Sequence, residues 1–197
     1  MKGLLIKNGA NALTALRIIG TPVALFVTNT LLDRNQDTEL FKFFAFLYIL
    51  ICFSDFFDGK VARKYGIVSR FGTVFDLIAD FCFVVFMHLV IMIHGIIPAW
   101  FMIVIIDRFF NFIITSKIET DCTNQRFKPK FDKAGKYIAA AMYILPFIIS
   151  AEYCFLDPGL FISKLFLYGI TGISIVTSIL RILTVKSFFV PKVDKLK

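Results

Sequence analysis

The sequence has few charged residues for its length. Only 18% of its 197 residues are Asp, Glu, Lys or Arg, against about 25% in an average soluble domain. The stretch from Phe81 to Ile106 contains no charged residue. A soluble domain of this size carries charge at nearly every helical turn, because its surface meets water. The composition excludes a soluble domain and a disordered chain, and it indicates an integral membrane protein.

Cysteine is also scarce and scattered. The four cysteines, Cys52, Cys82, Cys122 and Cys154, form no C-x-x-C pair. Such spacing indicates neither a zinc site nor a disulfide framework. We interpret them as reduced packing residues.

Six apolar segments are long enough to cross a bilayer. A helix rises about 1.5 Å per residue, so about 20 residues cross about 30 Å of hydrocarbon. Charges and the breakers Gly95 and Pro98 divide the chain into spans of about 10–32, 39–64, 70–94, 99–117, 133–151 and 160–185. Lipid leaves open strand edges unsatisfied, so these spans are expected to be helices. We therefore expect an all-α integral membrane protein with six transmembrane helices, forming a single membrane domain over residues 1–197.

The excess of positive charge orients these spans. The net charge is +8, and six spans place both termini on the same side. All but three of the 22 lysines and arginines lie at or near that side, the exceptions being Arg34, Lys42 and Lys164. The positive-inside rule then predicts cytoplasmic termini in a multi-pass protein of the cell (inner) membrane. No compact soluble basic domain is present, which disfavours nucleic-acid binding.

Four carboxylates fall inside the predicted spans. Charge is costly there, so a functional role is favoured over an ion-paired structural cluster. Asp55 and Asp58 are three residues apart on the second span, and Asp76 and Asp80 are four apart on the third. Each pair therefore shares one helix face. The four acids lie about 10 to 15 Å below the cytoplasmic ends of these two spans. Bound divalent cations that prefer oxygen ligands, Mg²⁺ or Mn²⁺, relieve the repulsion among four acids. Two such ions fit this set.

The connection between the acid pairs is rich in glycine and positive charge. Glycine allows close backbone approach, and the cations are partners for phosphate. This composition indicates a phosphorylated substrate. The residues are Gly59, Lys60, Arg63, Lys64, Gly66, Arg70 and Gly72.

A longer motif joins the acids. It reads Asp55-Phe-Phe-Asp58-Gly59-Lys-Val-Ala62-Arg63, then eight residues to Gly72, then Asp76 and Asp80. This pattern, D-x2-D-G-x2-A-R-x8-G-x3-D-x3-D, resembles the signature of the CDP-alcohol phosphatidyltransferase family at all eight fixed positions. The segment Asn11-Ala-Leu-Thr14-Ala-Leu-Arg17 is similar to the N-x-L-T-x-x-R that opens the family's first span.

The resemblance implies an enzyme of phospholipid biosynthesis, in which an alcohol attacks the β-phosphate of CDP-diacylglycerol and releases CMP. It implies that Asp55, Asp58 and Asp76 hold two divalent metal ions, with Asp80 sharing one ion and acting as general base. It also implies a homodimer among membrane lipids, and an active site facing the cytoplasm. The residues that it places at the CDP-lipid are Asn11, Thr14, Gly59, Ala62, Arg63, Ser69 and Gly72.

Three basic residues on later spans suit an acceptor that carries phosphate. Arg108, Lys136 and Arg181 lie toward the cytoplasmic parts of spans four, five and six. Lys136 suits a snorkelling anchor as well as it suits a phosphate ligand. Arg108 lies too deep for snorkelling, so we expect an anionic partner for it, either Asp107 or substrate. Serine or choline does not require three cations, so the pattern favours a phosphorylated alcohol.

Further segments bear on the identity of that alcohol. Pro98-Ala-Trp100, Asp107-Arg108 and Gly135-Lys136 resemble the P-A-W, G-R-E and G-K segments of phosphatidylglycerophosphate synthase-like members. The sequence departs from them at Phe81, Asp107, Phe109 and Tyr137-Ile138. The resemblance implies glycerol 3-phosphate as acceptor and phosphatidylglycerophosphate as product, with inositol phosphate or serine as alternative acceptors.

A cation-coupled transporter is the alternative from a different class, because buried acids also mark ion paths. The two halves of the sequence show no internal repeat, and the acids cluster on one side instead of marking a path across. Both features favour the enzyme. Metal-dependent release of CMP, as opposed to ion flux, separates the two hypotheses.

Overall fold

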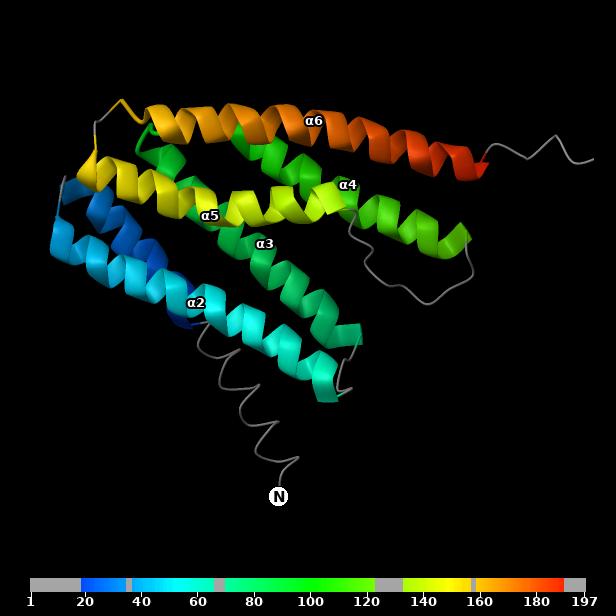
Figure 1. Cartoon of the computed structure of the whole chain (residues 1–197), viewed down its shortest axis with the longest axis horizontal. Coiled ribbons are helices and arrows are strands. Elements are labelled where there is room, and N and C mark those ends of the chain that lie inside the picture. The colour runs from blue at the N-terminus through cyan, green and yellow to red at the C-terminus, as the bar shows by residue number, and fades with distance from the viewer. Residues whose placement is uncertain (1–18, 35–36, 66–69, 123–132, 157–158, 190–197) are drawn as a thin grey trace, which may run out of the picture. The chain divides into compact units, whose positions relative to one another are not determined.

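The computed structural model describes residues 19–34, 37–65, 70–122, 133–156 and 159–189. Over these ranges the chain is helical apart from short turns and contains no β-strand. A helix at 19–34 is followed by five longer helices, drawn in Figure 1. They are α2 (Thr38–Tyr65), α3 (Arg70–Ile93), α4 (Trp100–Cys122), α5 (Lys133–Phe155) and α6 (Phe161–Phe189). The all-α prediction is confirmed for the described ranges, and each expected segment contains one helix.

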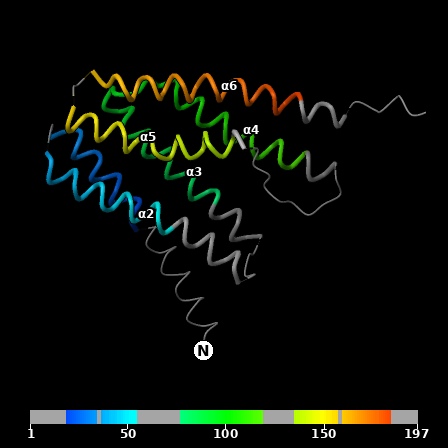
Figure 2. The backbone as a smooth tube through the Cα atoms, in the orientation of Figure 1, coloured from blue at the N-terminus to red at the C-terminus, as the bar shows by residue number. Residues whose placement is uncertain are grey.

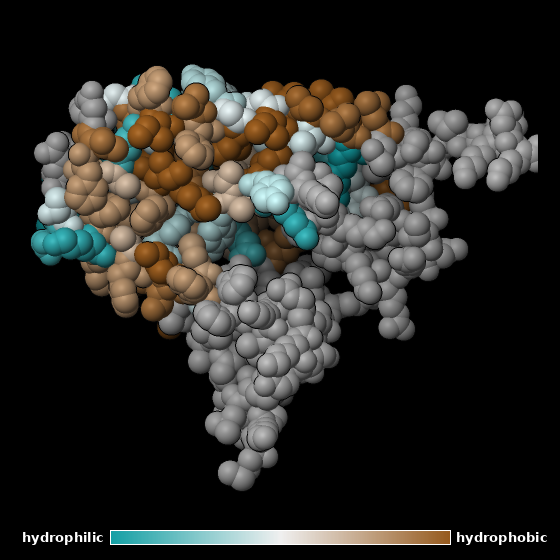
Figure 3. Space-filling model, in the orientation of Figure 1, coloured by the Kyte–Doolittle hydropathy of each residue, from teal (hydrophilic) through white to brown (hydrophobic). Residues whose placement is uncertain are grey.

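Among the residues that the structure describes, two stretches of helix are long and apolar enough to cross a membrane, Gly135–Phe155 on α5 and Phe161–Leu183 on α6. Leu77–Ile93 on α3 is a shorter apolar stretch. Much of the apolar surface of α6 is unburied, and apolar atoms gather along this helix in Figure 3. Water makes such a surface unfavourable, whereas lipid does not. Its largest exposed side chains include Phe161, Leu165, Tyr168, Val176 and Leu183.

The chain divides into two compact units. The first unit comprises Met1–Ile97 and Pro146–Leu160, and the second comprises Pro98–Leu145 and Phe161–Lys197. The division falls within α5, at Pro146. Each unit has a characteristic interior, which is aromatic in the first and partly polar in the second.

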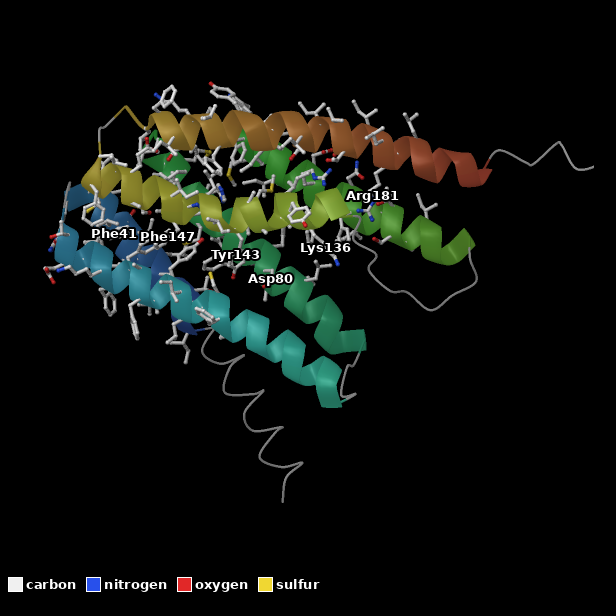
Figure 4. The ribbon with its side chains drawn as sticks, viewed as in Figure 1. Phe41, Asp80, Lys136, Tyr143, Phe147 and Arg181 are labelled. Carbon is white, nitrogen blue, oxygen red and sulfur yellow. The ribbon has the colours of Figure 1, made fainter. Side chains whose placement is uncertain are left out.

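Aromatic rings from three helices form the interior of the first unit. Tyr48 of α2 lies with its ring centroid 5.5 Å from that of Phe83 on α3 and 5.7 Å from that of Phe147 on α5. Phe41 of α2 also contacts Phe147, with the ring centroids 5.9 Å apart (Figure 4). The ring centroid of Phe44 on α2 lies 6.1 Å from that of Phe147. Tilted ring pairs at these distances add favourable quadrupole contacts to the burial of apolar area. The cluster holds α2, α3 and the end of α5 together.

One end of this unit is closed by polar contacts between helix ends. The Tyr153 hydroxyl on α5 donates to the carbonyl of Leu32, 3.1 Å away. His94 Nε2, just after α3, lies 3.2 Å from Asp33 Oδ1. Asp37 caps α2, because its Oδ1 accepts from a backbone N–H three residues later at 3.0 Å. The C-terminal ends of helix 19–34, α3 and α5 therefore meet at the N-terminus of α2.

Gly95 ends α3 in the left-handed region, with φ of +71°. Its N–H donates to the carbonyl of Met92 at 2.9 Å, and the N–H of Ile96 donates to that of Ile91 at 3.3 Å. This pair of bonds is the Schellman arrangement, which favours glycine because the conformation strains other residues. The prediction that the long apolar run breaks at Gly95 is confirmed.

In the second unit, α4 and α6 pack side by side and run parallel. The rings of Trp100 and Tyr168 lie 6.0 Å apart near the two N-termini. Further along, Ser116 of α4 accepts a hydrogen bond from Arg181 of α6. Residue numbers thus rise together along both helices, a course that Figure 2 follows. Further along the pair, polar side chains of the two helices form what we call the polar seam. Its members are Asp107, Arg108, Ser116, Ser174, Thr177, Ser178 and Arg181.

Candidate active site

The four signature acids lie on the adjoining parts of α2 and α3. The backbone is helical at all four positions, so the spacings of three and four residues keep each pair on one helix face. The side chains of Asp55, Asp58 and Asp76 lie outside the described part of the structure, whereas that of Asp80 lies within it and is half-buried (Figure 4).

The packing of α2 against α3 fixes the level of the acids relative to one another. The two helices are antiparallel neighbours in the first unit, with Tyr48 opposite Phe83. Asp55 lies seven residues after Tyr48, and Asp76 lies seven residues before Phe83, so these acids are level. Asp58 lies about one turn from Asp55, and Asp80 lies about one turn from Asp76. Because the helices are antiparallel, these two turns run in opposite directions along the pair. All four acids therefore fall within about 10 Å along the helix pair.

Such a donor set fits a hard divalent cation. Carboxylate oxygens are the ligands that Mg²⁺ and Mn²⁺ prefer, and the register places two pairs of them on neighbouring helices. Among the side chains that the structure describes, no three His, Cys, Asp or Glu gather, and only Asp80 of the four acids is in that set. The assignment of the metal ligands therefore stays a prediction that the helix register supports.

His88 is the buried titratable residue nearest to Asp80 along α3. It lies two turns beyond Asp80 and is completely buried. Its Nδ1 lies 2.7 Å from the carbonyl oxygen of Val84, one turn back on the same helix. This contact ties the imidazole to its own helix and favours a packing role.

The positions implied for the CDP-lipid fall mostly outside what the structure describes. Asn11, Thr14 and Ser69 lie outside the described residues. Gly59, Ala62, Arg63 and Gly72 lie on described helical backbone, but their side chains or immediate surroundings lie outside the described part. These contacts stay predictions.

Arg108 is held in the polar seam by oxygen atoms of α6. Its Nη1 donates to the Thr177 hydroxyl at 2.8 Å, to the Ser178 hydroxyl at 3.0 Å and to the backbone carbonyl of Ser174 at 3.3 Å. Asp107 Oδ2 accepts from the same Ser178 hydroxyl at 3.2 Å. Asp107, one of the two anionic partners expected for Arg108, is therefore linked to it through Ser178.

The other two predicted acceptor residues differ from each other. Arg181 donates from Nη2 to the Ser116 hydroxyl at 3.1 Å and lies over the Phe112 ring, 5.1 Å from its centroid. Both arginines thus belong to the α4–α6 pair. Lys136, one turn into α5, is exposed, which suits an anchor at a membrane surface as well as a ligand contact. Their shared role at a phosphate stays a prediction.

Sequence reasoning missed the hydroxyl partners of these arginines. Ser174 is not among the predicted site residues, but its carbonyl accepts from Arg108. Thr177 and Ser178 were not singled out at all. Their signal is present in the sequence, because positions 174, 177 and 178 have the spacing of one helix face. That face also carries Arg181.

The chain belongs to the CDP-alcohol phosphatidyltransferase family, whose sequence model matches residues 7–180. The matched region contains α2 to α5 and most of α6, and it includes every acid of the signature. The family resemblance predicted from the signature is thereby confirmed.

Several relatives share parts of this sequence. A Rickettsia typhi protein named CDP-diacylglycerol–glycerol-3-phosphate 3-phosphatidyltransferase is 46% identical over 77 residues, which are 38% of this chain and 39% of that protein. A Bacillus subtilis protein of the same name is 38% identical over 66 residues, 34% of each chain. A Mycobacterium tuberculosis protein named probable phosphatidylglycerophosphate synthase is 32% identical over 104 residues, 52% of this chain and 48% of that one. The chain thus spans at most about half the length of these relatives.

Proposed function

We propose that this protein transfers the phosphatidyl group of CDP-diacylglycerol to glycerol 3-phosphate, giving phosphatidylglycerophosphate and CMP. The observation that carries the proposal is the complete acid signature on two antiparallel helices, within a region that matches the family from residue 7 to residue 180. The names of the relatives, which specify glycerol 3-phosphate, support the choice of acceptor. We further propose that the whole chain acts as a single catalytic membrane domain.

In this reaction the acceptor hydroxyl oxygen forms a bond to the β-phosphorus, and the bond between that phosphorus and the bridging oxygen breaks. CMP leaves with the electron pair of the broken bond. Asp80 takes the hydroxyl proton, because an unactivated alcohol is a poor nucleophile near neutral pH. Asp55, Asp58, Asp76 and Asp80 hold two divalent ions, Mg²⁺ or Mn²⁺. Such ions supply charge neutralisation at the diphosphate and make CMP a better leaving group.

The CDP-lipid lies, on this proposal, beside the connection between α2 and α3. Arg63 pairs with phosphate oxygens, while Gly59 and Gly72 let the backbone approach the nucleotide. Asn11, Thr14, Ala62 and Ser69 complete that pocket. Arg108, Lys136 and Arg181 supply positive charge to the phosphate of the acceptor, and this charge favours a phosphorylated alcohol over serine.

We also propose six membrane spans with both termini in the cytoplasm, in the cell (inner) membrane, and an active site that faces the cytoplasm. The parallel course of α4 and α6 supports this topology, because α5 must then return across the same thickness. The excess of Lys and Arg on the side of the two termini supports the orientation. A homodimer follows from the family resemblance.

A competition assay tests the acceptor. Membranes containing the protein receive labelled CDP-diacylglycerol and Mg²⁺, with glycerol 3-phosphate, inositol phosphate, inositol or serine. We expect phosphatidylglycerophosphate as the dominant product, with stoichiometric CMP. A product formed only with serine contradicts the phosphate argument, and ion flux without release of CMP supports a transporter instead.

A further inference from the structure

The polar seam contains a chain of hydrogen bonds in which Arg108 donates to Ser178 and Ser178 donates to Asp107. Ser178 is buried, and its hydroxyl carries one proton. Asp107 Oδ2, 3.2 Å away, accepts that proton, because an ionised carboxylate can only accept. The lone pairs of the Ser178 oxygen are then left for Arg108 Nη1, 3.0 Å away. The negative charge of Asp107 therefore acts on the guanidinium through the hydroxyl.

This chain orients Arg108 more strongly than a single contact does. Nη1 has two protons and three acceptor oxygens within 3.3 Å, all on α6 and all uncharged. A hydroxyl that donates to a carboxylate is a stronger acceptor, since hydrogen bonds in a chain polarise one another. Ser178 thus combines two functions, since it binds the arginine directly and connects it to an acid.

Hydroxyl groups in apolar helices commonly bond to their own backbone instead. Thr171, two turns earlier on α6, does this by donating to the carbonyl of Leu167 at 2.8 Å. Ser178 differs, because both of its bonds described above reach α4. A serine that only allowed two helices to approach would not need an acid on one side and a cation on the other.

We propose that Asp107 and Ser178 are positioning residues, which fix the Arg108 guanidinium against α6 in the orientation that receives the phosphate of the acceptor. This inference rests on the proposed function, since it takes Arg108 as a ligand of the acceptor phosphate. Holding the guanidinium in advance reduces the rotamer freedom lost on binding, so it strengthens acceptor binding without altering the chemical step.

The central test is steady-state kinetics of Ser178→Ala with varied glycerol 3-phosphate. We expect its KM for glycerol 3-phosphate to rise about five- to tenfold, because one acceptor of Nη1 and the link to the acid are lost. The kcat and the KM for CDP-diacylglycerol should stay within about twofold of wild type. Ser178→Thr keeps the hydroxyl and should restore most of the acceptor affinity. Thr171→Val is the matched control, since it removes a hydroxyl that bonds only within its own turn, and it should leave all constants unchanged.

A double-mutant cycle tests whether Asp107 acts through Ser178. Asp107→Asn should raise the same KM about threefold, because the amide accepts a hydrogen bond but lacks the charge. The double variant should be no worse than Ser178→Ala alone. Additive effects overturn the proposed chain, and so does a Ser178→Ala enzyme with an unchanged KM for glycerol 3-phosphate. A rise in both KM values together with a fall in kcat, not restored by Ser178→Thr, also overturns the proposed chain, because it indicates a purely structural contact.

The wild-type protein separates this inference from the proposed function. If it releases CMP with glycerol 3-phosphate while the Ser178 and Asp107 variants behave as wild type, only the positioning role fails. If it shows no release of CMP with glycerol 3-phosphate, the proposed function fails first, and the positioning role fails with it.

Discussion

His94 and Asp33, 61 residues apart in the sequence, are joined by a contact of 3.2 Å between Nε2 and Oδ1. The imidazole is largely buried, at 15% exposure, while the carboxylate is 61% exposed. A second contact of 2.9 Å links His94 Nδ1 to the carbonyl oxygen of Val90. Asn29 also donates to Asp33, at 3.2 Å. The end of α3 is thereby fastened to the end of helix 19–34.

We expect His94→Ala to lower the free energy of unfolding by up to about 1 kcal/mol, since the pair is partly open to solvent. Thermal melting in detergent measures this loss. Lys42→Ala is the control, because the Lys42–Glu39 pair is exposed on both sides, at 67% and 80%, and should contribute almost nothing. Equal losses in the two variants contradict a special role for the His94 contact.

Asp80→Asn should reduce release of CMP at least about a hundredfold, because general base catalysis is worth about 10² to 10⁴ in rate. The variant should still insert into membranes and bind CDP-diacylglycerol, since an amide of equal size replaces the carboxyl. Glu39→Gln, which changes an exposed carboxyl at the start of α2, serves as control and should retain full turnover. Near-normal turnover of Asp80→Asn would remove this residue from the reaction.

Removal of divalent cations by a chelator should stop release of CMP, and added Mg²⁺ or Mn²⁺ should restore it. Asp58→Asn should need a metal concentration at least about tenfold higher for half-maximal rate, since it loses one of the carboxylate ligands. A titration of initial rate against free metal concentration measures both effects. Activity that persists in the chelator contradicts metal-dependent transfer by these acids.

Gly20 permits close contact between helix 19–34 and α2. A Cβ at this position lies 3.1 Å from Ile51 Cγ1, tighter than ordinary van der Waals contact. Gly20→Val should therefore destabilise the protein by about 1–3 kcal/mol, the usual cost of overpacking. Gly172→Val on α6 is the matched control, because no atom lies within 4 Å of a Cβ there. Comparable melting of the two variants contradicts the packing argument.

The sequence predicted the bounds of α2 and α3 closely. α2 and α3 begin and end within one residue of the predicted spans 39–64 and 70–94. α4, α5 and α6 continue four or five residues past the predicted ends at 117, 151 and 185. Hydropathy locates where lipid stops, but a helix satisfies its own backbone bonds and can continue into water. The extension of α4 contains Glu119 and Asp121, which fits this reason.

The site was predictable where a short motif carries it and unpredictable where distant residues meet. The spacing of the acids indicated that each pair shares one helix face, and the Tyr48–Phe83 contact added the level of one pair relative to the other. The partners of Arg108 lie 66 to 70 residues away on α6. Serine and threonine in apolar helices commonly bond to their own backbone, as Thr171 does, so their presence alone does not indicate a partner on another helix.

The parallel packing of α4 and α6 also sets an order of events during biosynthesis. A ribosome adds about 5 to 20 residues per second, so Ser174 and Ser178 are made about 3 to 14 s after Arg108. During that interval α4 carries a guanidinium whose α6 acceptors do not yet exist. On the six-span topology that we propose, the nascent chain must keep Arg108 near water or headgroups until α6 is complete. A variant that lacks α6 should for this reason leave α4 poorly inserted, a defect that begins in synthesis and precedes any loss of catalysis.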